Sequence, residues 1–235
     1  MRFVSKFFRR KQLVARFNCI LNDDARVNYK PTIKLLWRLT PEMMRRKIAE
    51  ANVQQAFVLA SVEHVASEFE NPKILCVGSF EDTAAAGLNA LGYTIEEIDP
   101  AINSDLDTFY RAYPEKHESY QIIFSTSVLE HVADDELFVG QINDLLAPRG
   151  VAIMTCDFND QYKPGDLLPP TDVRFYTKRD LSMRLMAAMP GCRLIDQPIW
   201  NCDTPDFTYA GLHYTFASFV VRKEEAKNRA HGLLA

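Results

Sequence analysis

The stretch KILCVGSFED, residues 73–82, begins with an apolar run and then breaks at a glycine. Apolar residues, some of them β-branched, extend from Ile74 to Val77, and a short run of this kind is typical of a buried strand. Gly78 follows and predicts a tight turn at the end of that strand. Because glycine has no side chain, the backbone of such a turn can approach a ligand closely. The stretch therefore predicts the first strand and the ligand-binding turn of an α/β domain.

The residues after the turn continue the same pattern. Alanine-rich residues 83–91 predict a helix, and Gly92 stands where a left-handed residue would end it. Residues 94–98 predict a second strand, which ends in Asp99. Strand, glycine turn, helix, strand and terminal acid form half of a nucleotide-binding sheet, in which the acid bonds ribose hydroxyls. An N-cap role is the alternative for Asp99, since a proline follows it.

The next segment adds two strands with a polar turn between them. Residues 120–124 predict a third strand, and the turn STSVLEHV follows at 125–132. Acids at 134–136 predict a helix start, because the helix macrodipole favours negative charge there. The sequence LLAPRG at 145–150 ends that helix, and residues 151–155 predict the next strand. This alternation predicts a mainly parallel sheet with helices between its strands.

This succession resembles the class I S-adenosylmethionine-dependent methyltransferases, and in particular their small-molecule and glycan branch. The resemblance covers roughly residues 73–222, and its most specific part is the Ser-Val-Leu-Glu-His-Val turn followed by LLAPRG. It implies a Rossmann-like α/β fold with a seven-stranded, mainly parallel sheet and helices on both faces. It also implies an enzyme that transfers the methyl group of S-adenosylmethionine to a small molecule or glycan, with oxygen as the favoured acceptor atom.

The glycine turn departs from the family pattern. Family members carry two or three glycines there, whereas this chain keeps Gly78 and has Phe80 and Asp82 at the other places. This departure leaves open a degenerate domain without cofactor, a nicotinamide enzyme, and a noncatalytic subunit that binds cofactor or activates a partner. A nicotinamide enzyme has little support, because pyrophosphate binding normally demands the glycine series. Asp99 and the Glu-His turn lie at the expected intervals and favour the methyltransferase.

The resemblance assigns the cofactor to strand ends and turns. It implies that Gly78 lies near the cofactor's amino-acid end, Asp99 at the ribose, and Ser125 with Thr126 at the sulfonium. Asp105 would accept the adenine amino group, although a role as helix N-cap is equally favoured. The predicted cofactor-binding residues are Val77, Gly78, Ser79, Asp99, Asp105, Leu106, Ser125 and Thr126.

Two residues are candidate general bases. An imidazole ordinarily titrates near neutrality, so His131 could take a proton from an acceptor hydroxyl, with packing under the cofactor or a bond to a backbone carbonyl as the alternative. Asp157 could serve as base, bind a hydroxylated acceptor or hold a metal, but no converging ligand set is evident and no metal is predicted. The long polar connection at 158–176 is expected to close over the acceptor. Its candidate substrate-binding residues are Asn159, Asp160, Tyr162, Arg174 and Tyr176.

Composition limits the function classes. The 235-residue chain has 47% hydrophobic and 25% charged residues, as an ordinary globular domain has. Its net charge of −4 argues against nucleic-acid binding, which normally needs a basic surplus. The five cysteines include no Cys-x-x-Cys pair, which favours reduced thiols over disulfides or zinc. No apolar run has the length of a membrane span, and no signal peptide is recognisable. Composition therefore predicts a cytoplasmic protein.

The chain divides into an N-terminal helical region at 1–72, the methyltransferase domain at 73–222 and a tail at 223–235. The first 22 residues hold six basic residues, no acid and several phenylalanines. This pattern fits a basic helix at a membrane surface, but packing on the domain or on a second subunit of a homodimer is the favoured interpretation.

Further helices and strands are expected on either side of the central pattern. In the N-terminal region a long helix is predicted over 40–69, with breaks near 22–24 and at Lys30–Pro31. Thr177 and Asp180 form a capping box for a helix through Met189. Residues 192–199 and 214–222 are expected as antiparallel strands at the sheet edge, separated by an insert.

Overall fold

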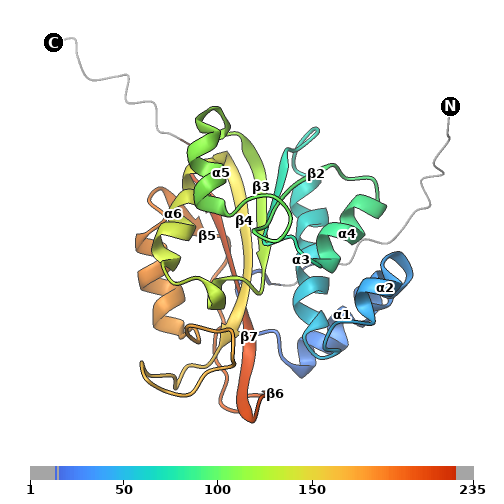
Figure 1. Ribbon diagram of the computed structural model, residues 1–235, viewed down its shortest axis with the longest axis vertical. Coiled ribbons are helices and arrows are strands. Elements are labelled where there is room, and N and C mark those ends of the chain that lie inside the picture. The colour runs from blue at the N-terminus through green and yellow to red at the C-terminus, as the bar shows by residue number, and fades with distance from the viewer. Residues whose placement is uncertain (1–13, 15, 226–235) are drawn as a thin grey trace.

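The computed structural model describes Val14 and residues 16–225, and these form one seven-stranded sheet (Figure 1). The strand order is β2-β1-β3-β4-β7-β5, and β6 pairs with β7. The first four strands are parallel and β7 runs antiparallel to β4, so the predicted α/β class and mainly parallel sheet are confirmed. The strands are β1 Ile74–Val77, β2 Ile95–Ile98, β3 Tyr120–Thr126, β4 Leu146–Phe158, β5 Cys192–Leu194, β6 Phe207–Tyr209 and β7 Leu212–Lys223.

Helices cover both faces of the sheet, as Figure 1 shows. Strand residues alternate between the two faces, so Cys76 joins the core under α3 whereas Leu75 joins the core under α6. The helices of the first face are α1 Asp23–Leu39, α3 Asn52–Ala66 and α4 Thr83–Ala90, and those of the second are α5 Leu106–Ala112 and α6 Asp135–Leu145. The other helical segments are α2 Pro41–Met44, the 3₁₀ turns Pro114–Lys116 and Leu129–His131, and a π-helical segment, Asp180–Leu185.

The register of β1 and β2 brings the two most informative sequence positions together. Val77 pairs with Ile98 at the ends of these parallel strands. The amide of Gly78 donates to the carbonyl of Ile98 at 2.9 Å. Gly78 and Asp99 therefore leave the sheet side by side, next to the end of β3.

The predicted helix over 40–69 is interrupted in the structure. Thr40–Pro41 does begin a helix, but α2 ends at Met44 and α3 begins at Asn52. The α3 helix is buried on nearly all sides because it lies between α1, α4 and the sheet, whereas α2 lies at the periphery, so one straight helix cannot occupy both places. The break predicted at Pro31 is also wrong, since Pro31 lies inside α1 on its solvent side.

The sheet edge agrees with prediction except in the length of β5. Strand β5 pairs antiparallel with β7 but ends at Leu194 rather than continuing to residue 199. Asp196 instead turns toward the N-terminal segment and accepts the amides of Phe17 at 2.8 Å and Asn18 at 3.1 Å. The side-chain oxygen of Asn18 in turn accepts the amide of Val220 at 2.7 Å, so this part of the basic segment packs on β7.

Residues 1–13 and 15 of the basic segment, and residues 226–235 of the tail, lie outside the described residues. Predictions for those parts therefore stay predictions. Over residues 16–225, no helix is long and apolar enough to cross a membrane. The capping box is confirmed, because the amide of Thr177 donates to Asp180 at 3.0 Å and that of Asp180 donates back to the Thr177 hydroxyl at 3.2 Å.

Candidate cofactor and acceptor site

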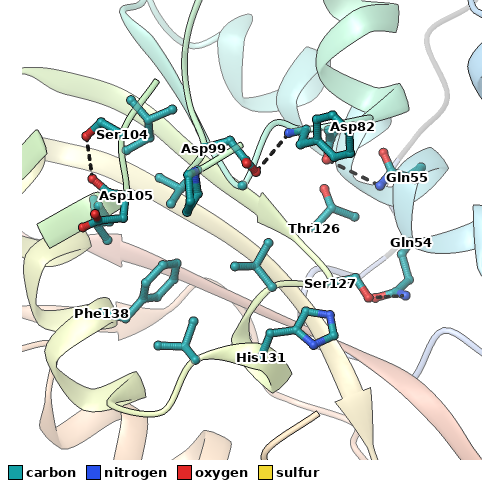
Figure 2. A pocket seen from close by; sticks show the side chains of 18 of the residues that line it. Gln54, Gln55, Asp82, Asp99, Ser104, Asp105, Thr126, Ser127, His131 and Phe138 are labelled. Carbon is teal, nitrogen blue, oxygen red and sulfur yellow. Dashed lines mark hydrogen bonds between the residues drawn. The ribbon is translucent and has the colours of Figure 1, made fainter. Parts of the chain in front are cut away.

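A cavity of about 770 Å³ opens at the carboxyl ends of β1, β2 and β3. This is the edge at which open α/β sheets bind their ligands. Figure 2 shows the side chains that surround it: Asp99 and Asp105 on one side, and Gln54, Ser127 and His131 on another. The cavity therefore lies where the sequence pattern predicts it.

Gly78 lies at the wall of the cavity in a backbone conformation that favours glycine. Its φ of +81° belongs to the left-handed region that glycine adopts readily. A Cβ at this position would come within 2.4 Å of Cγ2 of Val128, so a side chain does not fit there. Val77 also lines the cavity, whereas Ser79 is buried and absent from its lining.

The Asp99 side chain is held by backbone amides of two turns, the glycine turn after β1 and the turn that follows Asp99 itself. One carboxylate oxygen accepts the amide of Phe80 at 3.1 Å, and the other accepts the amide of Ala101 at 2.7 Å. The carboxylate therefore caps the turn at residues 100–103 and not a helix, since the next helix begins only at Leu106. A carboxylate has about four lone-pair sites, so this one still has room for two hydroxyl donors from the cavity.

Asp105 is a helix N-cap and also lies in the lining of the cavity. It is the N-cap of α5, accepting the amide of Thr108 at 2.9 Å and its hydroxyl at 2.8 Å. The hydrogen bond from the Thr108 amide lowers the pKa of the carboxyl group. Asp105 and the buried Leu106 also line the cavity.

Polar atoms without partners gather around the cavity. The hydroxyl of Thr126 and the side-chain oxygens Oδ1 of Asn52 and Oε1 of Gln54 are buried and have no hydrogen-bond partner among the described residues. All three residues line the cavity, whereas the predicted Ser125 is buried behind it. Since unpaired buried polar groups cost free energy, these atoms fit a cavity that binds a polar ligand.

His131 lines the cavity but carries an acidic partner. Its Nδ1 lies 3.2 Å from Oδ1 of Asp172 and 3.1 Å from the carbonyl of Thr171. The hydrogen bond with Asp172 raises the pKa of the imidazole to about 9. The group is then a cation at neutral pH, where a general base would have to be neutral.

The other candidate base, Asp157, lies below the cavity. It is 5% exposed and is not part of the lining. Burial, followed by the charge of the neighbouring Glu130, raises the pKa of this carboxyl group well above its usual range. Asp157 therefore has no direct route to an acceptor in this structure.

The connection at 158–176 folds back against the end of β4. Its ends are joined by backbone hydrogen bonds from Asn159 to Tyr176 and from Tyr176 to Asp157, both 2.9 Å. The Tyr176 side chain is fully buried, with its hydroxyl on Asp135 at 2.6 Å. None of the five predicted substrate-binding residues, Asn159, Asp160, Tyr162, Arg174 and Tyr176, is part of the cavity lining.

The remaining predicted substrate residues have partners within the fold. Asp160 accepts the amide of Lys178 at 2.8 Å, and the ring of Tyr162 packs edge-on against Phe175. Arg174 pairs with Asp135 at 3.3 Å. The polar groups of this segment therefore form hydrogen bonds and ion pairs within the fold, and they are not part of the cavity lining.

The cavity also has residues that the sequence interpretation missed. Residues 46–55 contribute much of its lining, including Arg46, Lys47, Asn52 and Gln54. Gln55 fixes this segment to α4, since its Oε1 accepts the amide of Ala84 at 2.8 Å. Three amide side chains at the start of an otherwise apolar helix were the available signal. No group of His, Cys, Asp and Glu residues within 16–225 is arranged to hold a metal ion.

Comparisons with solved structures show which known proteins share this fold. No family model and no curated protein matches the sequence. Among solved structures, Burkholderia thailandensis 1,6-didemethyltoxoflavin-N1-methyltransferase, crystallised with 1,6-didemethyltoxoflavin and S-adenosylhomocysteine, has a TM-score of 0.53 at 16% identity, covering 83% of this chain and 89% of that one.

Two further structures show the same likeness. A putative sarcosine dimethylglycine methyltransferase from Galdieria sulphuraria has a TM-score of 0.52 at 11% identity, over 83% of this chain and 99% of that one. The [4+2]-cyclase SpnF has a TM-score of 0.53 at 13% identity, over 77% and 85%. The chain therefore has the Rossmann-like α/β fold that these proteins share.

Proposed function

We propose that the chain is an S-adenosylmethionine-dependent methyltransferase that acts on a small molecule. The observation that carries the proposal is the 770 Å³ cavity at the ends of β1, β2 and β3, with Gly78 and Asp99 at its wall. The Burkholderia structure of the same fold holds S-adenosylhomocysteine together with 1,6-didemethyltoxoflavin. The fold, the place of the cavity and the strand-end acid all favour this cofactor.

The residues of the cavity fit such a cofactor. Asp99 can accept the two ribose hydroxyls, and Leu106 offers an apolar surface to an adenine ring. The turn at Gly78 accepts no side chain and so leaves space for the amino-acid end. The unpaired hydroxyl of Thr126 lies where the sulfonium end would follow. When bound, the cofactor supplies a methyl group already activated for transfer.

The protein's part in the chemistry is orientation and charge. Methyl transfer needs acceptor, methyl carbon and sulfur in line, and holding them so supplies much of the rate enhancement. His131 keeps its proton at neutral pH, so we propose that it binds the acceptor oxygen as a cation rather than removing a proton. An acceptor with an acidic hydroxyl, such as a phenol or an enol, suits this arrangement because it can bind as the anion. The reaction is thus an O-methylation.

The predicted substrate residues enter the proposal indirectly. Arg174 and Tyr176 both hold Asp135, the first residue of α6, and α6 lines the cavity through Phe138 and Gln141. We propose that they position this helix. Acceptor contacts then fall to residues 46–55 and to the turn that contains His131.

Calorimetry with S-adenosylhomocysteine and NAD tests which cofactor the protein binds. The protein should bind the first and not the second, and it should transfer labelled methyl from S-adenosylmethionine to members of a panel of phenols and enols. Preference for NAD would contradict the proposal. Binding without any transfer across the panel would instead favour the noncatalytic partner subunit, and the cyclase with this fold shows why transfer itself must be measured.

A further inference from the structure

A chain of hydrogen bonds leads from the cavity into the protein at Ser127. Nε2 of Gln54 donates to Oγ of Ser127 at 3.2 Å, and Ser127 Oγ donates to Oε1 of Glu130 at 2.6 Å (Figure 2 shows the first of these bonds). A hydroxyl has one proton and two lone pairs, so with its proton on Glu130 one lone pair is left for a group in the cavity. Ser127 is therefore an acceptor at the cavity wall, supported by a carboxylate behind it.

The carboxylate behind Ser127 is buried among other acids. Glu130 is 1% exposed, and its Oε2 has no hydrogen-bond partner among the described residues. Three carboxylates here face a single imidazolium, so the group is negative unless it holds protons. The titratable groups that act on Glu130 are Asp157 and Cys156 from β4, Asp172 from the connection after it, Tyr214 from β7, and His131 from its own turn.

We propose that Glu130, acting through Ser127, makes this end of the cavity prefer the cationic methyl donor to its neutral thioether product. The inference rests on the proposed function, which puts the sulfonium beside Thr126, the neighbour of Ser127 in the cavity lining. A positive charge there is attracted by the buried carboxylate, and the attraction is strong because little water intervenes. Methyl transfer leaves the carbon–sulfur electron pair on sulfur, so the charge and this attraction disappear together. The same group therefore favours donor binding and product release.

Proton release provides a second signature of the same interaction. Burial raises the pKa of Glu130, and burial together with the charge of Glu130 raises that of Asp157. A bound cation lowers the pKa of nearby carboxyl groups and so drives out protons that they hold. A neutral ligand of the same shape has no such effect. Binding of S-adenosylmethionine should therefore release protons that binding of S-adenosylhomocysteine does not.

Calorimetry at pH 7 in two buffers of different ionisation enthalpy measures both signatures. The affinity ratio of S-adenosylmethionine to S-adenosylhomocysteine should fall about tenfold from wild type to Glu130→Gln. The extra proton release should shrink to what the buried Asp157 still contributes. The glutamine can still accept the Ser127 hydrogen bond, which preserves the local shape. Ser127→Ala keeps the buried charge but removes the bridging hydroxyl, and it should lose part of the preference.

Glu136→Gln is the matched control, because it removes the same charge from an exposed position on α6. It should keep the wild-type ratio and proton release. Wild-type values in Glu130→Gln would overturn the inference while leaving the proposed function intact. If Glu130→Gln does not fold, Ser127→Ala alone decides the question. If the wild type binds neither ligand, the proposed function fails and this inference with it.

Discussion

The cavity has two walls that are built in different ways. The strand-end wall, formed by residues 77–80 and 98–106, comes from one short part of the sequence and relies on backbone amides and helix caps. The helical wall, formed by residues 46–55 and 127–141, joins side chains from distant elements, as in the bond between Gln54 and Ser127. It also has the buried acids behind it.

We expect ligand binding at the strand-end wall to depend on the shape of the backbone, and ligand binding at the helical wall to depend on charge. At the strand-end wall, the affinity for the proposed cofactor should depend on the backbone conformation of the two turns. This affinity should vary little around neutral pH. At the helical wall, the protonation of His131 and of the carboxylates below it should decide what binds. Substitutions and pH changes can therefore test the two walls independently.

The largest effect is expected at the strand-end wall from Gly78→Ala. The added methyl group would lie 2.4 Å from Val128 in a residue whose φ is +81°, so the turn must move. We expect S-adenosylhomocysteine binding, measured by calorimetry, to weaken by about 100-fold or more. Gly92→Ala is the control, since its φ is +95° but nothing lies within 4 Å of the new Cβ. It should lose about 1–2 kcal/mol of stability and keep its affinity.

Asp99→Asn should have the next largest effect. Loss of the charge should weaken S-adenosylhomocysteine binding by about 1.5–2.5 kcal/mol, because asparagine keeps one oxygen acceptor but loses the charge that strengthens the hydrogen bonds. Asp105→Asn makes the same chemical change at a residue that caps α5, and asparagine is as good a cap as aspartate. Its loss of affinity in the same titration should be smaller. Equal losses would mean that the two acids share the cofactor equally, and an unchanged Asp99 variant would contradict the ribose assignment.

The strand-end wall was also the part that could be predicted from sequence. The first strand was predicted at its observed bounds, Ile74–Val77, and Gly92 has the expected left-handed conformation. These features are local, because a strand, its turn and the following cap depend on neighbouring residues. The ends of parallel strands meet at one edge, so Asp99 could be placed there from the sheet pattern alone.

The helical wall depends on contacts that no local pattern contains. The interruption between α2 and α3, which brings Arg46 and Lys47 to the cavity, follows from how α3 is enclosed by the fold. The role of Glu130 depends on acids from β4 and the connection after it. Asn159 and its neighbours carry suitable chemistry, but the backbone of Asn159 pairs with Tyr176, and neither residue is part of the cavity lining.

The smallest effect concerns the pH dependence of stability at the helical wall. Hydrogen bonding to Asp172 raises the folded-state pKa of His131 to about 9, against about 6.5 in an unfolded chain. A raised pKa means that the folded state binds the proton more tightly, so the stabilisation is fully present below pH 6.5 and is lost as pH rises toward 9. Because the His131 side chain is 41% exposed, solvent screening reduces the contribution to about 1 kcal/mol.

His131→Gln removes this titration and keeps a polar side chain at the same place. The free energy of unfolding of the wild type, measured in urea, should exceed that of the variant by about 1 kcal/mol at pH 6. This excess should shrink toward zero by pH 9.5. Groups that do not interact with His131 titrate alike in both proteins and cancel in the difference. An excess that stays constant between pH 6 and 9.5 would show that His131 does not hold its proton more tightly in the fold. The neutral imidazole would then be available as a general base, and the helical wall would bind its acceptor by shape, as we propose that the strand-end wall binds the cofactor.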